Sequence, residues 1–566
     1  MIRYFVTGAN GFIGRNLCRV LIEEGRAVTA LIRPNAAVAL PPEVRVIQST
    51  FDQPEDYGPA LAECDYVIHL AGNARFGNGP GYQDANVTNT EKLLKIVAAH
   101  APRLRRFVFV STMGAVDRPA ADRCQAPLTE DSSAHPTSDY GRSKLAAERL
   151  VAASGLPFSI VRPAMVVGGD MRANSHVAVF ARMAASKNLF SMLRWPGKVC
   201  VLHVDDLARG LVIAAEHASA AGRIFFAAGQ PISIGDIFAR TSPNGSRLEI
   251  GWLAELLRPI APLLPFQAKV ILHSALAIDD SALRGLGWKL KYDAAQAISG
   301  VIERERRRVD PSLPLRGRTV VTGAASGLGR ALAQALAQRK RRLLLVDRDL
   351  DGLNGVCAGE ANIERQRCDL ADEKDVDALL SSAAWSSEPI DEVFACAGLG
   401  LRGSVASLPF EGQADVLRVN VFSRLQLVHR ALRQMLVRQF GRIILVSSSS
   451  AYQALPFMTV YAASNAALLL FGEGLASETK EEGIEVLTVC PGGMRTRFQK
   501  SSGVHEVPGE KLMEPEAVAE EILAALGRGR IVIMPSLRSK AMALTARILP
   551  RKVSLALWRR LMEKLR

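Results

Sequence analysis

The sequence holds few cysteines, and none is placed for a disulfide framework or a metal centre. Its 566 residues include 8 cysteines, with no Cys-x-x-Cys pair and no histidine–cysteine cluster at the spacing of metal ligands. We therefore expect no bound metal and reduced thiols, as in a cytoplasmic protein.

Long apolar runs are also missing. No uncharged apolar stretch reaches the ~18 residues that a membrane-spanning helix needs. The first residues lead directly into a strand and a glycine motif, so we expect no signal peptide. The chain is predicted to be cytoplasmic.

Acidic residues are scarce near the C-terminus. Residues 527–566 hold eleven arginines and lysines and a single glutamate, and so account for most of the net charge of +14. We treat residues 536–566 as a basic amphipathic tail, because Leu557, Trp558, Leu561, Met562 and Leu565 form one helical stripe. The tail could lie on the inner membrane surface as a peripheral element, or pack on its own domain. No nucleic-acid motif accompanies the charge, so we expect no nucleic-acid partner.

A glycine-rich turn opens the chain. Residues 2–14 read as a strand, a tight turn and the start of a helix. Three glycines there let the backbone turn, approach a pyrophosphate and pack the helix on the strand. The predicted cofactor contacts of this turn are Gly8, Asn10, Gly11, Phe12, Ile13 and Gly14.

The next strands carry further cofactor candidates. Residues 27–32 end at Arg33, which can meet a ribose 2′-phosphate, so this half is predicted to prefer NADP(H). Asp52 is a candidate adenine contact, and Ala71 ends a buried strand where the cofactor passes. The alternative for Arg33 is a solvated strand end.

Two residues one helical turn apart suggest acid/base chemistry. Tyr140 and Lys144 share a helix face. A phenol is a poor proton shuttle at neutral pH, and a nearby ammonium lowers its pKa. The alternative is that the two residues lie on a solvent-exposed helix face without a catalytic role, since Tyr-x-x-x-Lys arises often by chance.

The order of these motifs resembles the extended branch of the short-chain dehydrogenase/reductase family over about residues 1–305. The resemblance implies NAD(P) and a hydroxyl, tyrosine and lysine site. By motif position the hydroxyl is Thr112, although Ser111 could contribute. The stretch after Arg162, which includes residues 222–295, would form the substrate lobe, and it looks similar to the 3β-hydroxysteroid-dehydrogenase-like group. Its apolar stretch 252–266 is either a hydrophobic lid over the substrate or ordinary core.

A second strand and glycine motif, similar to the one that opens the chain, follows a predicted linker at 306–317. Residues 318–535 resemble the single-domain branch of the same family. The acidic end of residues 343–347 favours NAD(H). The family pattern implies cofactor contacts at Gly323, Ser326, Gly327, Leu328, Gly329, Asp347, Asp369, Leu370, Ala397, Gly398, Asn420, Tyr461 and Pro491, and a catalytic set of Asn420, Ser448, Tyr461 and Asn465.

The second half departs from the family pattern at two positions. Cys396 stands where asparagine is usual, and Asn465 replaces the catalytic lysine. Asparagine carries no charge to lower the pKa of Tyr461. This half is therefore either a reduced or inactive cofactor-binding scaffold, or another cation reaches the site from elsewhere in space.

The resulting expectation is an α/β chain with two tandem Rossmann doubly wound parallel sheets, the first with a small substrate lobe. We expect an NAD(P)-dependent oxidoreductase acting on a hydrophobic ketone or alcohol, with its chemistry mainly in the N-terminal half. The alternative is a nucleotide-sugar epimerase or dehydratase with retained NAD. The resemblance favours a homodimer, or a pseudo-dimer of the two halves.

Overall fold

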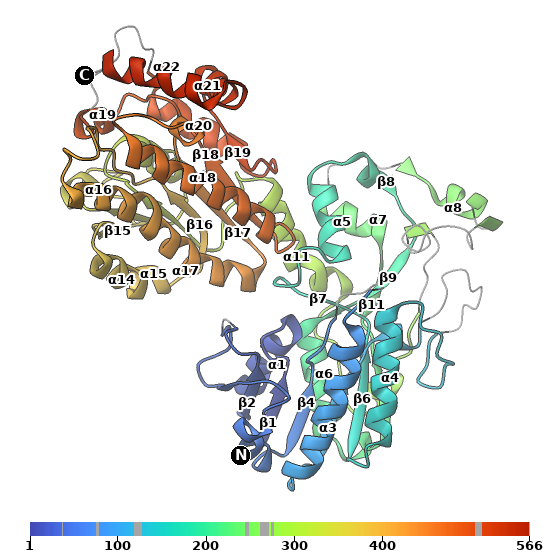
Figure 1. Cartoon of the computed structure of the whole chain (residues 1–566). Helices are drawn as coiled ribbons and strands as arrows, with labels where there is room; N and C mark the ends of the chain where they lie inside the picture. The colour runs from blue at the N-terminus through green and yellow to red at the C-terminus, as the bar shows by residue number, and fades with distance from the viewer. Residues whose placement is uncertain are drawn as a thin grey trace. The chain divides into compact units, whose positions relative to one another are not determined.

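The computed structural model describes residues 1–36, 38–74, 79–117, 127–243, 248–257, 259–260, 271–272, 277–503 and 512–564. Two compact units are present (Figure 1). The first comprises Met1–Met171 and Ser175–Glu305, and the second comprises Arg172–Asn174 and Arg306–Arg566. Each unit contains one seven-stranded sheet.

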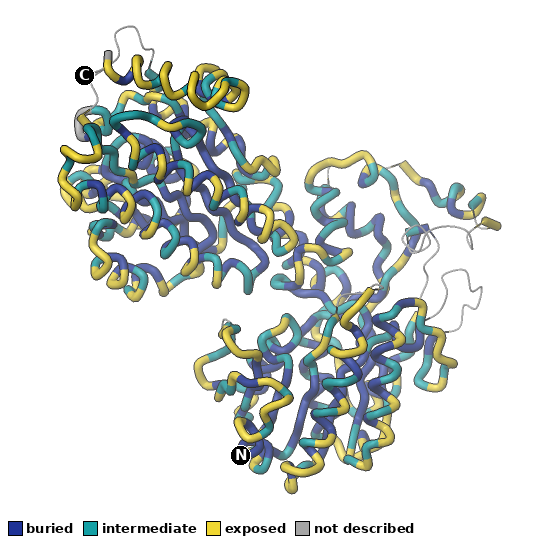
Figure 2. The backbone as a smooth tube through the Cα atoms, in the orientation of Figure 1, coloured by how far each residue is buried: buried dark blue, intermediate teal, exposed yellow. Residues whose placement is uncertain are grey.

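The first sheet is parallel throughout, in the order β10-β6-β5-β4-β1-β2-β3. Its strands are β1 (Arg3–Thr7), β2 (Ala27–Ile32), β3 (Arg45–Gln48), β4 (Tyr66–His69), β5 (Arg106–Val110), β6 (Phe158–Pro163) and β10 (Arg223–Ala227). The central strands are nearly all buried, which explains their continuous apolar sequence, because helices cover both faces of a parallel sheet. Figure 2 shows these strands as the buried centre of the unit.

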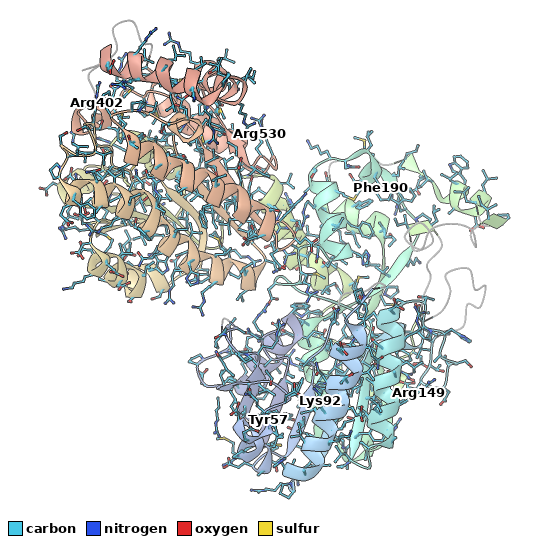
Figure 3. The ribbon with its side chains drawn as sticks, viewed as in Figure 1. Tyr57, Lys92, Arg149, Phe190, Arg402 and Arg530 are labelled. Atoms are coloured by element: carbon cyan, nitrogen blue, oxygen red, sulfur yellow. The ribbon has the colours of Figure 1, made fainter. Side chains whose placement is uncertain are left out.

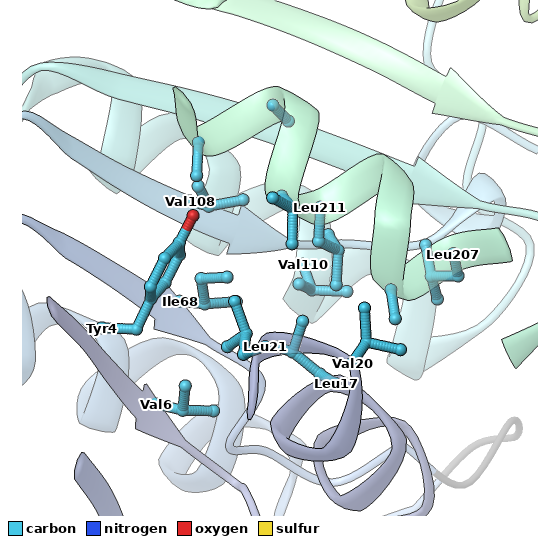
Figure 4. Packing of buried hydrophobic residues seen from close by; sticks show 14 of the residues in the cluster. Tyr4, Val6, Leu17, Val20, Leu21, Ile68, Val108, Val110, Leu207 and Leu211 are labelled. Atoms are coloured by element: carbon cyan, nitrogen blue, oxygen red, sulfur yellow. The ribbon is translucent and has the colours of Figure 1, made fainter. Parts of the chain in front are cut away.

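Helices pack on both faces of this sheet. α1 (Phe12–Glu23) and α6 (Val204–Glu216) cover one face, where Leu17 and Leu21 meet Leu207 and Leu211 over Val108 (Figure 4). α2 (Gly58–Ala62), α3 (Asn89–His100) and α4 (Asp139–Ala153) cover the other. The amphipathic pattern of α1 and α6 therefore has its core partner in the sheet.

A smaller lobe follows the sixth strand of the sheet. Its elements are β7 (Met165–Val167), α5 (His176–Ala185), β8 (Leu193–Arg194), β9 (Lys198–His203), β11 (Gln230–Ser233), α7 (Ile234–Thr241), β12 (Leu248–Glu249), α8 (Gly251–Leu257) and α11 (Ala294–Val309). The short helix α10 (Ser281–Arg284) instead packs on the core of the main sheet through Leu283. Trp252 and Leu256 of α8 are 67% and 66% exposed, so this end of the apolar stretch is not core. Residue 258 and residues 261–266 of that stretch lie outside the described residues.

The division between the two units falls between Glu305 and Arg306, where the linker is predicted to begin. Helix α11 continues to Val309, so the first residues of the segment 306–317 are helical rather than extended. The helix ends just before Pro311, a residue that cannot continue the backbone hydrogen bonding of a helix.

The second sheet repeats the first in topology, in the order β15-β14-β13-β16-β17-β18-β19, again all parallel. Its strands are β13 (Arg318–Thr322), β14 (Leu343–Asp347), β15 (Ile363–Arg367), β16 (Ile390–Ala395), β17 (Gly441–Val446), β18 (Ile484–Val489) and β19 (Val532–Ile533). The predicted pair of tandem doubly wound Rossmann sheets is confirmed. In such sheets the strand order reverses beside the first strand, and ligands bind beyond the carboxyl ends of the strands at that point.

Helices also cover both faces of the second sheet. α12 (Gly327–Gln338), α13 (Leu350–Asn354) and α20 (Pro515–Ala525) pack on one face. α14 (Glu373–Ser381), α15 (Ala383–Ser386), α17 (Ser423–Arg438) and α18 (Thr459–Thr479) pack on the other, and α16 (Phe410–Leu417) and α19 (Arg497–Ser501) complete the unit.

The basic tail forms two helices, α21 (Leu537–Ile548) and α22 (Arg551–Lys564). Met562 of the predicted stripe is 5% exposed, and its carbonyl accepts a hydrogen bond of 2.7 Å from Arg402, a residue labelled in Figure 3. Leu557, Trp558 and Leu561 face a cavity of the second unit. These contacts favour the alternative in which the tail packs on its own domain. Among the described residues, no helix combines the length and apolar character needed to cross a membrane.

Candidate active sites

The first glycine turn has the geometry of a cofactor cradle. Gly8 has φ +70°, and a Cβ there would lie 2.5 Å from the amide nitrogen of Ala71. A Cβ on Gly14 would collide with the carbonyl oxygen of Gly8, so the helix approaches the strand only because both residues lack side chains. Asn10 fixes the neighbouring loop, since its Oδ1 accepts a bond of 3.1 Å from the Ala39 amide.

The start of α1 is open to an anion. Phe12 and Ile13 form its first turn, and Gly11 at its N-cap offers no side-chain hydrogen bond to the backbone amides. Such uncapped amides fit a pyrophosphate. Arg33 lies exposed just after β2, as a contact with a 2′-phosphate requires. Asp52 is exposed and pairs with Lys92 of α3 at 2.5 Å (Figure 3).

Tyr140 and Lys144 lie in the first turns of α4, whose N-cap is Ser138. The Lys144 Nζ donates a hydrogen bond of 2.7 Å to the carbonyl of Val110, the last residue of β5, and lies 4.4 Å from the centroid of the Phe109 ring. Burial lowers the pKa of Lys144 to about 8, and Glu148 opposes that shift. Tyr140 is 9% exposed, beside the ring of Tyr82. The ammonium is thus held between the sheet and the helix that carries the phenol.

The hydroxyl candidates of the first half differ in their surroundings. Thr112 caps the short helix η3 (Met113–Ala115) with a bond of 3.1 Å from the Gly114 amide, and it is partly exposed. The Ser111 hydroxyl is buried and has no hydrogen-bond partner among the described residues. In the second half, Ser448 caps η8 (Ser449–Tyr452) in the same way, with a bond of 3.1 Å from the Ser450 amide. This repeated geometry supports Thr112 as the residue equivalent to Ser448.

Asn86 is a site residue that the sequence reasoning missed. Its Oδ1 accepts from the Asn73 amide at 2.7 Å, and its Nδ2 donates to the Ser143 hydroxyl at 3.0 Å. Asn420 makes the same pair of bonds, to the Leu399 amide at 2.8 Å and the Ser464 hydroxyl at 3.0 Å. Both asparagines lie in π-helical turns, η2 (Gln83–Thr88) and η7 (Arg418–Phe422). The shared dipeptide Asn-Val was the available signal.

The second half contains a cavity of about 1080 Å³ beyond the strand ends. All its predicted site residues line that cavity: Gly323, Ser326, Gly327, Leu328, Gly329, Asp347, Asp369, Leu370, Ala397, Gly398, Asn420, Ser448, Tyr461, Asn465 and Pro491. A Cβ on Gly323 would lie 2.8 Å from the Cα of Ala397, and the Ser326 hydroxyl makes no capping bond to α12. A glycine cradle before uncapped helix amides fits a dinucleotide pyrophosphate.

The catalytic candidates of the second half all line this cavity. Burial raises the pKa of Tyr461, and Ser448 and Arg424 oppose the rise. Asn465 is buried, and its Nδ2 donates to the backbone carbonyl of Tyr461 at 2.9 Å. It therefore fills the position of the missing lysine without supplying a charge. Cys396 also lines the cavity, and burial raises its pKa to about 12, so its thiol stays protonated at neutral pH.

Two Rossmann units with glycine cradles and a tyrosine beside a strand-end hydroxyl define a nicotinamide-dependent enzyme. Comparison with known proteins agrees. Residues 4–228 match the NAD dependent epimerase/dehydratase family, and residues 318–506 match the short chain dehydrogenase family. The chain belongs to the short-chain dehydrogenase/reductase superfamily, with an extended-type domain followed by a single-domain type, and it is an NAD(P)-dependent enzyme.

Individual relatives are distant. A glycine betaine reductase of Emericella nidulans is 24% identical over 542 residues, which cover 85% of this chain and 42% of the relative. This chain thus spans under half the length of that relative. An uncharacterized oxidoreductase of Staphylococcus aureus is 28% identical over 209 residues, or 37% of this chain and 89% of the relative.

Solved structures match about half of the chain each. A short-chain dehydrogenase from Sphingobium yanoikuyae in complex with NADPH is 25% identical with a TM-score of 0.37, and covers 42% of this chain and 93% of its own. A UDP-glucuronic acid 4-epimerase from Bacillus cereus in complex with NAD is 21% identical with a TM-score of 0.42, and covers 54% of this chain and 99% of its own.

Proposed function

We propose that the chain interconverts a hydrophobic ketone and its alcohol, with its main chemistry at Thr112, Tyr140 and Lys144. The observation that carries this proposal is the buried Lys144 ammonium, bonded to the strand-end carbonyl of Val110 one helical turn from Tyr140. A cation in that place lowers the pKa of a phenol, which a solvated surface pair would not do.

The residues divide the work of a carbonyl reduction. A bound nicotinamide would supply the hydride to the substrate carbon. Tyr140 donates its phenolic proton to the substrate oxygen, and Lys144 stabilises the phenolate that remains. Thr112 orients the same oxygen by a hydrogen bond. Asn86 holds the loop after β4 in place through its bonds to Asn73 and Ser143.

Apolar surfaces in both units support a hydrophobic substrate. Trp252 and Leu256 of the lobe are largely exposed, and Leu557, Trp558 and Leu561 line the cavity of the second unit. Ligand pockets are mostly apolar with a few placed polar groups, which is the arrangement around Tyr461.

An epimerase or dehydratase with retained NAD is the second candidate, favoured by the match of residues 4–228 to that family. The two functions differ in cofactor balance. An oxidoreductase oxidises added NADPH or NADH in proportion to the ketone consumed, in assays with acetophenone, cyclohexanone and a long-chain methyl ketone. Purified protein that carries one tightly held NAD, and consumes none of the added cofactor with any ketone, would establish the epimerase or dehydratase instead.

We also propose that the first half uses NADP(H) and the second NAD(H), because Arg33 follows β2 and Asp347 is the last residue of β14, the second strand of its sheet in chain order. Arg33→Ala should weaken NADPH binding on the order of tenfold, the loss of one charge-assisted hydrogen bond, and leave NADH binding unchanged. Asp347→Ser should let the second half accept NADPH, since the carboxylate no longer repels the phosphate. Calorimetric titration of each variant with both cofactors measures this, and unchanged affinities would contradict the assignment.

A further inference from the structure

The second half has a buried cation beside Tyr461 that does not come from the family's lysine position. Arg424 of α17 is 2% exposed and lines the cavity together with Tyr461. Its Nη1 donates a hydrogen bond of 2.6 Å to the carbonyl of Val446, and its Nε donates one of 3.1 Å to Ala397. A buried guanidinium with these carbonyl partners still carries a positive charge that no carboxylate in these hydrogen bonds neutralises.

The two halves make this contact from different helices. Val110 and Val446 are the last residues of β5 and β17, and in each half a cation bonds to that carbonyl, at 2.7 Å from Lys144 and 2.6 Å from Arg424. Lys144 comes from the helix that carries the tyrosine. Arg424 comes from the preceding helix, four residues after Asn420.

Each half has a neutral residue at the position where the other half has its cation. Asn465 stands at the position of Lys144, and Thr90 stands at the position of Arg424. Thr90 stands four residues after Asn86 in the first half, where Arg424 stands after Asn420 in the second. Its hydroxyl donates to the Asn86 carbonyl at 2.7 Å and contacts His69 at 3.0 Å. Each half therefore places one cation against the end of the equivalent strand, but the cation comes from α4 in the first half and from α17 in the second.

We propose that the second half is a second active site, in which Arg424 replaces the missing lysine and activates Tyr461 for reduction of a hydrophobic carbonyl compound by NADH. The proposal rests on the oxidoreductase function proposed above. The carbonyl carbon gains the hydride, NADH is oxidised to NAD⁺, and the O–H bond of Tyr461 breaks as a new O–H bond forms on the substrate oxygen. Water then reprotonates the phenolate. Arg424 acts through Tyr461 and is a positioning residue.

The electrostatics of the pair agree with this role. Burial raises the pKa of Tyr461, and Arg424 acts against that rise. Burial lowers the pKa of Arg424 to about 10, so the guanidinium keeps its charge at neutral pH. Lys144 loses its charge near pH 8. The second site should therefore remain active to higher pH than the first.

The substrate class follows from the apolar side chains of the tail helices that line the cavity. Leu557, Trp558, Leu561 and Met562 of α22 line it, with Met542 of α21. A cavity lined by these apolar side chains as well as by Tyr461 and Ser448 suits a substrate with one polar carbonyl on an apolar body.

The kinetic test uses full-length chains that carry Tyr140→Phe, so that only the second site can act. NADH-dependent reduction of the ketone panel is measured against pH. Arg424→Met should lower the rate about 100-fold, whereas Arg430→Met, at an exposed position of the same helix, should not change it. Adding Asn465→Lys to Arg424→Met should restore at least tenfold, because a cation returns from the family position. A lost rate without rescue would indicate a merely structural arginine and overturn the proposal.

If the Arg424→Met chain does not fold, Arg424→Lys provides a second test of the same role. A buried lysine loses its proton at lower pH than a guanidinium, so the alkaline limit of the rate should fall to lower pH. An unchanged alkaline limit would overturn the proposal.

A second measurement does not depend on finding a substrate. In chains labelled with fluorotyrosine, Tyr461→Phe identifies the Tyr461 resonance, and its titration reports the phenol directly. Arg424→Met should move that titration to higher pH, and Arg430→Met should leave it unchanged. If no ketone is reduced yet the titration moves, the proposed substrate class fails and the role of Arg424 stands. If the titration does not move, the role of Arg424 fails.

Discussion

Tyr140→Phe, introduced into a chain that already carries Tyr461→Phe, is expected to lower ketone reduction by about 1,000-fold. Phenylalanine keeps the ring that packs beside Tyr82 and removes only the hydroxyl that donates the proton. Positioned acid/base groups contribute about 10²- to 10⁴-fold to a rate. NADPH affinity should stay within a few-fold, because the glycine turn and Arg33 remain intact. Steady-state rates and fluorescence titration of NADPH measure the two quantities.

The matched control is Tyr57→Phe in the same background. Tyr57 is a buried tyrosine of the core on the α3 and α4 face, and its hydroxyl contacts only the Phe51 carbonyl, at 3.4 Å, among the described hydrogen bonds (Figure 3). Its loss should leave the rate unchanged. Equal rates with and without Tyr140→Phe would show that the chemistry of the first half does not use Tyr140.

Lys144→Met is expected to lower the rate of the first site about 100-fold and to remove a pH limit near 8. Burial lowers the pKa of Lys144 from 10.5 to about 8. The ammonium is therefore fully present well below pH 8 and is lost as the pH rises through about 8. Because the charged form stabilises the phenolate, the wild-type rate of this site should fall over the same interval. Rate–pH profiles in the Tyr461→Phe chain measure the effect.

Two further variants sharpen the Lys144 experiment. Lys144→Arg keeps a cation that titrates at higher pH, so the alkaline limit should move upward. Lys95→Met removes an exposed lysine of α3 that pairs with Glu91, and should change nothing. A wild-type rate that holds constant through pH 8, or a Lys144→Met profile that keeps the same limit, would contradict the role given to Lys144.

Much of the fold was readable from the sequence because the signals are local. The strand–glycine–helix turns at Gly8 and Gly323 are contiguous, and their backbone geometry demands glycine wherever a Cβ would strike the neighbouring chain. Continuous apolar strands flanked by helices predict parallel sheets covered on both faces. Thr112 and Ser448 were also candidates by their motif positions, and the matching caps at Gly114 and Ser450 are visible only in the structure.

The unpredicted parts depend on contacts between distant segments. Arg424 reads as an ordinary helix residue in sequence, and only folding brings it to the Val446 carbonyl and the cavity of Tyr461. The apolar stripe of α22 follows from the helical spacing of its residues, but that spacing does not tell whether the stripe contacts lipid or protein. Asn86 escaped notice because the dipeptide Asn-Val that it shares with Asn420 is too short a signal, and its bonds to Asn73 and Ser143 appear only in the folded chain.

Two nicotinamide sites in one chain have a functional consequence. If each tyrosine has its own cation, Lys144 from α4 and Arg424 from α17, the two sites can act at different pH and with different cofactors. The variants with one tyrosine removed separate these contributions without cutting the chain.

The most direct test of the oxidoreductase assignment is isotope transfer. Wild-type protein is given NADPH or NADH deuterated at the reactive C4 position, together with whichever ketone of the panel is consumed, and the product is analysed by mass spectrometry. The account predicts one deuterium on the carbinol carbon of each alcohol formed, with one oxidised cofactor per product. Product without deuterium and without net oxidation of the added cofactor would contradict it.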